Sequence, residues 1–142
     1  MPIAFEPVIP ILRSFDEAKA KEFYVGFLGF TLDWKHRFDK NAPLYMQVSR
    51  GSLILHLSEH HGDASPGASL MVRMTGVADL HREVTARKYK YGRPGLEKTP
   101  WKTRSLTVHD PFGNRIRFEE EISREKKHIA PKKSPKPVRK RK

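Results

Sequence analysis

The sequence predicts an α+β fold built from two tandem β-α-β-β-β modules. The first observation is residues 105–120 (SLTVHDPFGNRIRFEE), where apolar and polar residues alternate on both sides of an Asp-Pro-Phe-Gly turn, the pattern of a half-buried hairpin. The second is that a similar hairpin, with a helix before it, occurs earlier in the chain. Equivalent positions are about 60 residues apart, as for Ile9 and Ser69 or Gly51 and Gly113. We therefore expect an internal duplication.

The first module begins with a short apolar run, whose prolines predict an irregular edge strand at residues 7–13. Ser14 and Glu17 have the spacing of a capping box, which predicts a helix that begins at Ser14. Apolar residues then recur at helical spacing as far as Gly29, where the helix should end. The strands expected after the helix span residues 30–38, 45–49 and 52–58.

A loop at residues 60–67, rich in Gly, Pro, Asp and Ser, separates the modules. The second module should contain a strand at 69–74, a helix from 77 to about 87, an uncertain stretch at 89–99 and then the hairpin. The modules thus span about 6–60 and 67–121 of one domain at 1–122. A single helix covers only one face of each sheet, so we expect the sheets to curl into a cup that forms the site.

Composition excludes several classes of site and location. The chain has no cysteine, so disulfides, thiolate metal sites and cysteine nucleophiles are absent. No apolar run reaches the length of a membrane span, and the start MPIAFEPVIP lacks the pattern of a signal peptide. We expect a soluble, cytoplasmic protein.

The net charge of +12 is concentrated at the end of the chain. Residues 123–142 hold ten Lys and Arg against one Glu, which leaves 18 basic and 15 acidic residues in the rest. This segment should be a disordered tail. It either contacts nucleic-acid phosphates weakly and without sequence preference, because it has no aromatic residue, or only solubilises the protein. The candidate contacts are Lys132, Lys133, Lys136, Arg139, Lys140, Arg141 and Lys142.

Three segments, FYVGFLGF, GSLILHLSEHH and DPFGNRIRFEE, resemble the vicinal-oxygen-chelate superfamily, also called the glyoxalase/bleomycin-resistance/dioxygenase superfamily. The resemblance covers about residues 6–121 and is closest to the bleomycin-resistance proteins. It implies four metal-ligand positions in the superfamily's enzymes, which fall here on Ile9, His56, Ser69 and Arg117. Only His56 is an ordinary ligand, and an arginine repels a divalent cation. We therefore expect no metal, no cofactor and no catalytic residue.

What the resemblance implies instead is a homodimer, with exchange of an N-terminal strand, that sequesters a bleomycin-type glycopeptide in a groove at the dimer interface and so confers antibiotic resistance. Trp34, Phe38 and Trp101 match aromatic positions of that branch, and aromatic rings suit the stacking of flat ligand rings. His56 should face the cup as a ligand contact or a hydrogen-bonded structural residue, whereas His60 and His61 should be a solvated loop pair. The predicted ligand contacts are Trp34, Phe38, His56, Ser69, Trp101, Arg104 and Arg117.

Two alternatives remain. Strand alternation places several arginines on the polar cup face, namely Arg13, Arg73, Arg115 and Arg117. They would favour an anionic ligand, unlike the cationic tail of bleomycin, unless carboxylates such as Glu119 pair with them. One alternative is thus an enzyme of the superfamily that acts on an anionic small molecule, with His56 as a base. The other is a nucleic-acid-associated protein that works through its tail.

Overall fold

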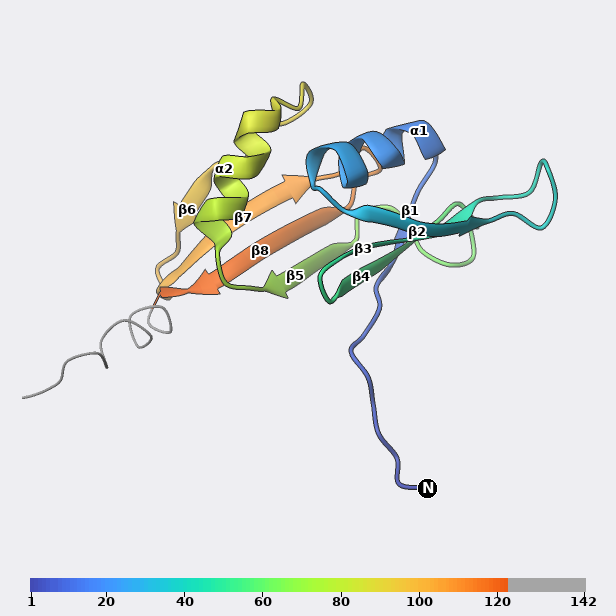
Figure 1. The fold of residues 1–142 in the computed structure, drawn as a ribbon, viewed down its shortest axis with the longest axis horizontal. Coiled ribbons are helices and arrows are strands. Elements are labelled where there is room, and N and C mark those ends of the chain that lie inside the picture. The colour runs from blue at the N-terminus through green and yellow to red at the C-terminus, as the bar shows by residue number, and fades with distance from the viewer. Residues whose placement is uncertain (123–142) are drawn as a thin grey trace, which may run out of the picture. The chain divides into compact units, whose positions relative to one another are not determined.

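The computed structural model describes residues 1–122, and the candidate nucleic-acid contacts of the tail lie outside the described residues. The chain divides into two compact units. The first unit comprises residues 1–69 together with 109–115, and the second comprises 70–108 and the chain from 116 onward. Each unit is built on a four-stranded sheet (Figure 1). The predicted α+β fold of two repeated modules is confirmed.

The sheet of the first unit has the strand order β1-β4-β3-β2. Strand β1 runs parallel to β4, whereas β4, β3 and β2 are joined as antiparallel neighbours. The sheet is therefore mixed. Its strands are β1 (Ile11–Arg13), β2 (Thr31–His36), β3 (Tyr45–Arg50) and β4 (Leu53–Ser58).

The helix of the first unit begins later than its capping-box pattern predicts. Helix α1 (Glu17–Ala20) continues as a π-helical stretch, η1 (Lys21–Phe27). Its N-cap is Asp16, whose extended backbone lets the carboxylate accept a hydrogen bond from the amide of Lys19 at 2.9 Å. Ser14 does not cap the helix: its buried hydroxyl has no hydrogen-bond partner among the described residues, and its amide bonds to the carbonyl of Ser58, at the end of β4. The start predicted at Ser14 is wrong by two residues.

The core of the first unit consists of the helical residues that the sequence pattern predicts and one face of the sheet. The helix buries Ala20, Phe23, Tyr24, Phe27 and Leu28, and the sheet buries Leu12, Met46, Val48, Leu55 and Leu57. Burial of each large apolar side chain contributes about 1.5–3 kcal/mol. The opposite face of this sheet is left for polar and aromatic residues.

The Asp-Pro-Phe-Gly turn belongs to the first unit, although it follows β7 in the sequence. The buried carboxylate of Asp110 accepts hydrogen bonds from the hydroxyl of Tyr24 at 2.6 Å and from the side-chain amide of Asn114 at 2.7 Å. The same amide group donates to the carbonyl of Arg13 at 2.8 Å. Gly113 has a φ of 91°, which a side chain would strain. The turn is therefore fixed by buried polar contacts to the helix and to β1.

The second unit repeats the arrangement, with the strand order β5-β8-β7-β6 and one helix. The helix lacks a side-chain cap of its own at Gly76, and the carboxylate of Glu120 accepts from the amides of Gly76 and Val77 instead. Its elements are β5 (Ser69–Arg73), α2 (Val77–Arg87), β6 (Leu96–Lys98), β7 (Thr103–His109) and β8 (Arg115–Glu121). The uncertain stretch before the hairpin thus contains one short strand. Nowhere in residues 1–122 is there a helix with the length and hydropathy of a membrane span.

Candidate functional site

A β-bulge in the first unit sets which residues face the open side of its sheet. The register between β2 and β3 pairs Leu32 with Val48 but Trp34 with Gln47, so Asp33 is the extra residue. Paired residues share a face, and Val48 and Gln47 lie on opposite faces of β3. Leu32 therefore lies on the core face, whereas Trp34 lies on the open face. Strict alternation along β2 would place both residues on the same face, and the bulge prevents this.

Aromatic rings gather on this open face and line a groove of about 500 Å³. The rings of Trp34 and Tyr45 are nearly parallel, at 11°, with their centroids 6.0 Å apart. The ring of Phe38 lies edge-on to His36 at 4.8 Å and to His60 at 6.4 Å. Trp34 is 44% exposed and Phe38 is 79% exposed, so both rings offer surface to a ligand. The groove is lined by Trp34, His36, Phe38, Tyr45, His60 and Asp63.

A chain of hydrogen bonds crosses the face behind these rings. The carboxylate of Asp33 can only accept, so the side-chain nitrogen of Gln47, 3.0 Å away, is the donor. The Gln47 oxygen then accepts from Nε2 of His56 at 3.0 Å. Nδ1 of His56 consequently carries no proton and accepts from the Tyr45 hydroxyl at 2.7 Å. The chain thus fixes the tautomer of His56 and holds the ring of Tyr45 in place.

The electrostatics of these two residues follow from their surroundings. Burial lowers the pKa of His56, since loss of solvent disfavours the imidazolium form. Burial first, and then the negative charge of Asp63, raises the pKa of Tyr45. Both side chains are therefore neutral at pH 7, and His56 has the hydrogen-bonded structural role that was one of its two predicted roles.

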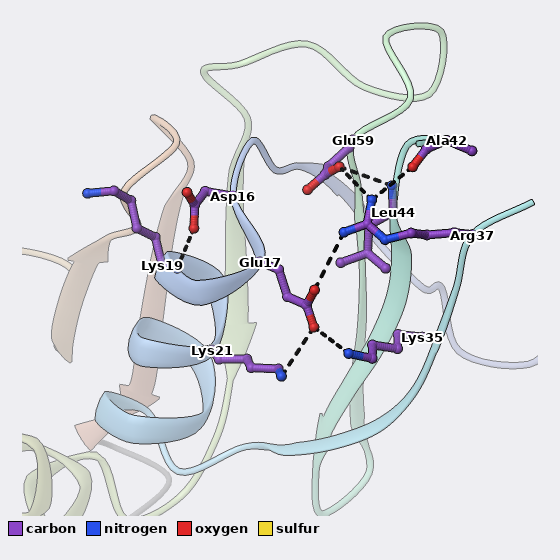
Figure 2. Close-up of polar contacts among 9 residues, drawn as sticks. All are labelled: Asp16, Glu17, Lys19, Lys21, Lys35, Arg37, Ala42, Leu44 and Glu59. Atoms are coloured by element: carbon purple, nitrogen blue, oxygen red, sulfur yellow. Dashed lines mark hydrogen bonds and ion pairs between the residues drawn. The ribbon is translucent and has the colours of Figure 1, made fainter. Parts of the chain in front are cut away.

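A salt-bridge cluster on the other face of β2 supports the groove (Figure 2). The carboxylate of Glu17 binds Lys35 at 2.6 Å, Lys21 at 3.1 Å and Arg37 at 3.5 Å. Arg37 also donates to the carbonyl of Ala42 at 2.8 Å and lies 3.8 Å from Glu59. Lys35 and Arg37 flank His36 in the sequence, and Glu59 precedes His60. The cluster therefore holds Lys35, Arg37 and Glu59 in place. These residues are the sequence neighbours of side chains that line the groove.

The structure brings together three of the predicted ligand contacts, Trp34, Phe38 and His56. The sequence analysis missed Tyr45, Gln47 and Asp63. The alternation along β3, where Met46 and Val48 are buried, could have revealed the first two. No sequence signal singles out Asp63, which lies in the loop after β4. His60 and His61 lie in the loop after β4, as predicted; His61 is exposed, whereas the half-buried ring of His60 lines the groove.

In the second unit, Trp101 lies in the turn before β7 and is 61% exposed. Its indole N–H points at the carboxylate of Glu119, 3.4 Å away, and the hydroxyl of Thr103 donates to the same oxygen at 3.1 Å. Arg104 lies on β7 and Arg117 on β8, and both are half-buried. The exposed ring of Trp101 is thus attached to a buried carboxylate.

Most of the arginines that raised the possibility of an anionic ligand have local partners. Arg73 lies 3.7 Å from Glu119 and 3.5 Å from Glu121. Arg115 donates to the hydroxyl of Ser69 at 3.2 Å, and the guanidinium of Arg13 lies 4.7 Å over the ring of Phe15. Among these three arginines, Arg73 meets the condition of a carboxylate partner such as Glu119. A hydroxyl and an aromatic ring do not neutralise a guanidinium, so the contacts of Arg115 and Arg13 leave the question of an anionic ligand open.

Comparison with known proteins identifies the family. A family model described as "Glyoxalase superfamily protein" matches residues 1–125. The chain belongs to the glyoxalase superfamily. This confirms the resemblance seen in the sequence. No curated protein matches the chain.

Several solved structures share the fold. A bleomycin-binding protein complexed with bleomycin is 23% identical, with a TM-score of 0.62 over 82% of this chain and 99% of that one. A glyoxalase-related enzyme from Clostridium phytofermentans is 21% identical, with a TM-score of 0.68 over 84% and 98%. TnmS3, an antibiotic binding protein from Streptomyces sp. CB03234, is 21% identical, with a TM-score of 0.60 over 84% and 99%. At such identities the likeness shows the fold alone.

The residues at the superfamily's metal positions do not suit a divalent cation. His56 has both ring nitrogens engaged, and the residue paired with it on β1 is Ile11, while Ile9 precedes the strand. The other two positions hold Ser69, bonded to Arg115, and the cationic Arg117. Residues 1–122 contain no group of three or more His, Asp or Glu that could hold a metal ion. We therefore assign no chemistry to a metal here.

Proposed function

We propose that this chain is a metal-independent binding protein that sequesters a bleomycin-type glycopeptide antibiotic in the cytoplasm and thereby confers resistance. The observation that carries the proposal is the groove of the first unit, in which exposed aromatic rings stand beside a neutral, fully bonded histidine. Such a site offers a large aromatic contact surface, which suits binding by affinity.

The parallel rings of Trp34 and Tyr45 suit the stacking of a flat heteroaromatic group of the ligand. Aromatic side chains provide large contact areas and have only two rotatable bonds, so they lose little entropy on binding. The bonds from Tyr45 to His56 and onward to Gln47 reduce that loss further, because one ring is already fixed. The groove is thus preorganised on the side of β3.

The N-terminal arm, residues 1–10, supports the proposed homodimer. Figure 1 shows this segment leading away from β1 without joining a strand or a helix. Met1, Ile3, Phe5 and Val8 are each at least 85% exposed. Several large apolar side chains exposed on one short segment are typical of an interaction site. We propose that the arm packs on a second copy of the chain, as in strand exchange.

Sedimentation analysis of the full chain and of a variant that lacks residues 1–8 tests the dimer. Replacement of Ile3, Phe5 and Val8 by serine provides a matched control, since it keeps the length of the arm and removes its apolar contacts. We expect a dimer for the full chain and monomers for both variants. A full chain that stays monomeric at about 100 μM would contradict the proposal.

Calorimetric titration of chelator-treated protein with copper-loaded bleomycin tests the binding function. We expect saturable binding of about one drug per chain, and a loss of at least about tenfold in affinity for Trp34→Ala. Tyr91→Ala, which removes an aromatic residue that is 62% exposed in the second unit, is the control. Absence of binding at high micromolar drug would refute the proposal.

The remaining predicted contacts lie outside the groove and are proposed as further ligand contacts. They are Ser69, Trp101, Arg104 and Arg117. Trp101→Phe keeps an aromatic ring, whereas Trp101→Ala removes it, so the pair separates stacking from the indole hydrogen bond to Glu119. An affinity for bleomycin equal to that of the unmodified chain in both variants would remove Trp101 from the site.

Nucleic-acid contact through the tail is a second candidate function, favoured by the ten basic residues at 123–142. We expect weak binding to mixed-sequence duplex DNA that falls steeply with added salt. Truncation after Ile122 should abolish it, and truncation should leave drug binding unchanged. DNA binding that survives truncation would place the contact elsewhere.

A further inference from the structure

We propose that the groove of the first unit recognises an organic cation, an alkylammonium or similar group of the ligand, held between the aromatic faces and the carboxylate of Asp63. The inference rests on the proposed function, because it takes this groove to be the binding site. It adds the chemical class of the group that the groove selects.

The aromatic lining supplies the first part of such a receptor. Cations are attracted to the faces of aromatic rings, most strongly to Trp, at distances within about 6 Å of the ring centre. Trp34 and Tyr45 present nearly parallel faces, and the ring of Phe38 is 79% exposed beside them. These three rings surround the groove from β2, β3 and the loop that follows β2.

The second part is the fixed negative charge of Asp63. Its carboxylate lines the groove and is oriented by the hydroxyl of Ser58, which donates to it at 2.6 Å. Asp63 lines the groove together with Tyr45, and its negative charge, after burial, contributes to the raised pKa of that tyrosine. Asp63 is therefore placed to compensate a cation that lies over the rings.

Within the part of the chain that the structure describes, no lysine or arginine competes for Asp63 in the groove, which is also lined by His36 and His60. The nearest basic residues in the sequence, Lys35 and Arg37, are turned to Glu17 on the other face of β2. Asp63 is thus the one carboxylate among the described residues that line the groove, although the whole chain is strongly basic.

The hydroxyl of Tyr45 adds an acceptor of defined direction. Its proton is donated to Nδ1 of His56, so only its oxygen lone pairs remain for a ligand. A ligand N–H can donate to this oxygen, whereas a carbonyl or carboxylate of a ligand cannot bond to it. The polarity of the hydrogen-bond chain and the charge of Asp63 therefore favour the same class of ligand.

A pair of isosteric probes tests the inference directly. Choline and 3,3-dimethyl-1-butanol have nearly the same shape and differ in charge. The chain has two tryptophans, so Trp101→Phe leaves Trp34 as the fluorescent reporter in the groove. The titrations with the two probes are made at the same pH and at constant ionic strength, so that only the charge of the probe differs.

We expect saturable changes in Trp34 fluorescence with choline, and an affinity at least about tenfold lower for the neutral alcohol. Asp63→Asn should weaken choline binding by about five- to tenfold, and it keeps an oxygen that can accept from Ser58. Glu97→Gln removes the same charge from an exposed site on β6 and should change nothing.

Equal affinities for choline and the alcohol, or no response to choline at up to about 50 mM, would overturn the inference. The comparison of choline with the alcohol uses an unmodified groove. It therefore tests the inference even if the Asp63 variant misfolds. Bleomycin calorimetry on the same samples separates the two proposals. Binding of bleomycin without selection for choline refutes only the cation site, and selection for choline without binding of bleomycin refutes only the proposed antibiotic.

Discussion

Removal of one hydroxyl group, by Tyr24→Phe, should destabilise the first unit measurably. The hydroxyl donates to the Asp110 carboxylate at 2.6 Å, and both residues are nearly inaccessible, at 0% and 6% exposure. A hydrogen bond to a charged group contributes about 1.5–3 kcal/mol. Asp110 keeps three other donors, from the amides of Phe112 and Asn114 and the side chain of Asn114. We therefore expect a loss of about 2 kcal/mol in the free energy of unfolding.

Urea denaturation followed by circular dichroism measures this loss, and calorimetry should show a fall in Tm of about 6 °C for a chain of this length. Tyr91→Phe, at a position that is 62% exposed, should change the free energy of unfolding by less than about 0.5 kcal/mol. If Tyr24→Phe were as mild as the Tyr91 control, the buried turn would not be held as we describe.

Three further predictions concern the groove and its support. Hydrogen bonds from Lys35 and then Lys21 lower the pKa of Glu17 to about 2. Because the folded-state pKa lies below the unfolded value, Glu17 should stabilise the fold fully above about pH 4.5 and lose this effect as the pH falls toward 2. The stability difference between the unmodified chain and Glu17→Gln should shrink over that range in urea titrations, and a constant difference would contradict the assignment. The NMR titration of His56 should have its midpoint below the ordinary value of 6.5. Gln47→Glu should raise the pKa of His56, because it places a carboxylate beside Nε2. An unchanged midpoint in that variant would rule out the contact between residue 47 and His56. Gly113→Ala should cost about 1–2 kcal/mol of stability because of its positive φ, whereas Gly95→Ala, with open space around it, should be nearly neutral in the same denaturation assay.

The repeat of hairpin and helix was enough to predict the α+β class, because periodicity reports directly which side chains are buried. Helix α2 and the second hairpin lie where their patterns place them. The start of α1 was missed because Ser14 and Asp16 are both good N-cap residues. The structure decides between them, because the carboxylate of Asp16 accepts from the amide of Lys19, whereas the hydroxyl of Ser14 has no hydrogen-bond partner among the described residues.

The candidate site was predicted less completely than the fold, because it depends on contacts between distant segments. Trp34 and Phe38 were predicted from the resemblance to the bleomycin-resistance proteins, whose aromatic positions they match. The face on which Trp34 lies is set by the bulge at Asp33, and a bulge leaves no mark in a pattern of period two. Asp63 and His60 join the groove from a loop whose path the sequence does not determine.

Chemical-shift mapping of the metal-free protein during titration with bleomycin tests the central claim most directly. The account predicts that the largest changes occur at the indole N–H of Trp34, the side-chain amide of Gln47 and the backbone amide of His60. It also predicts that they saturate together without added metal. Changes confined to α2 and β6 of the second unit, or changes that appear only after a divalent metal is added, would contradict it.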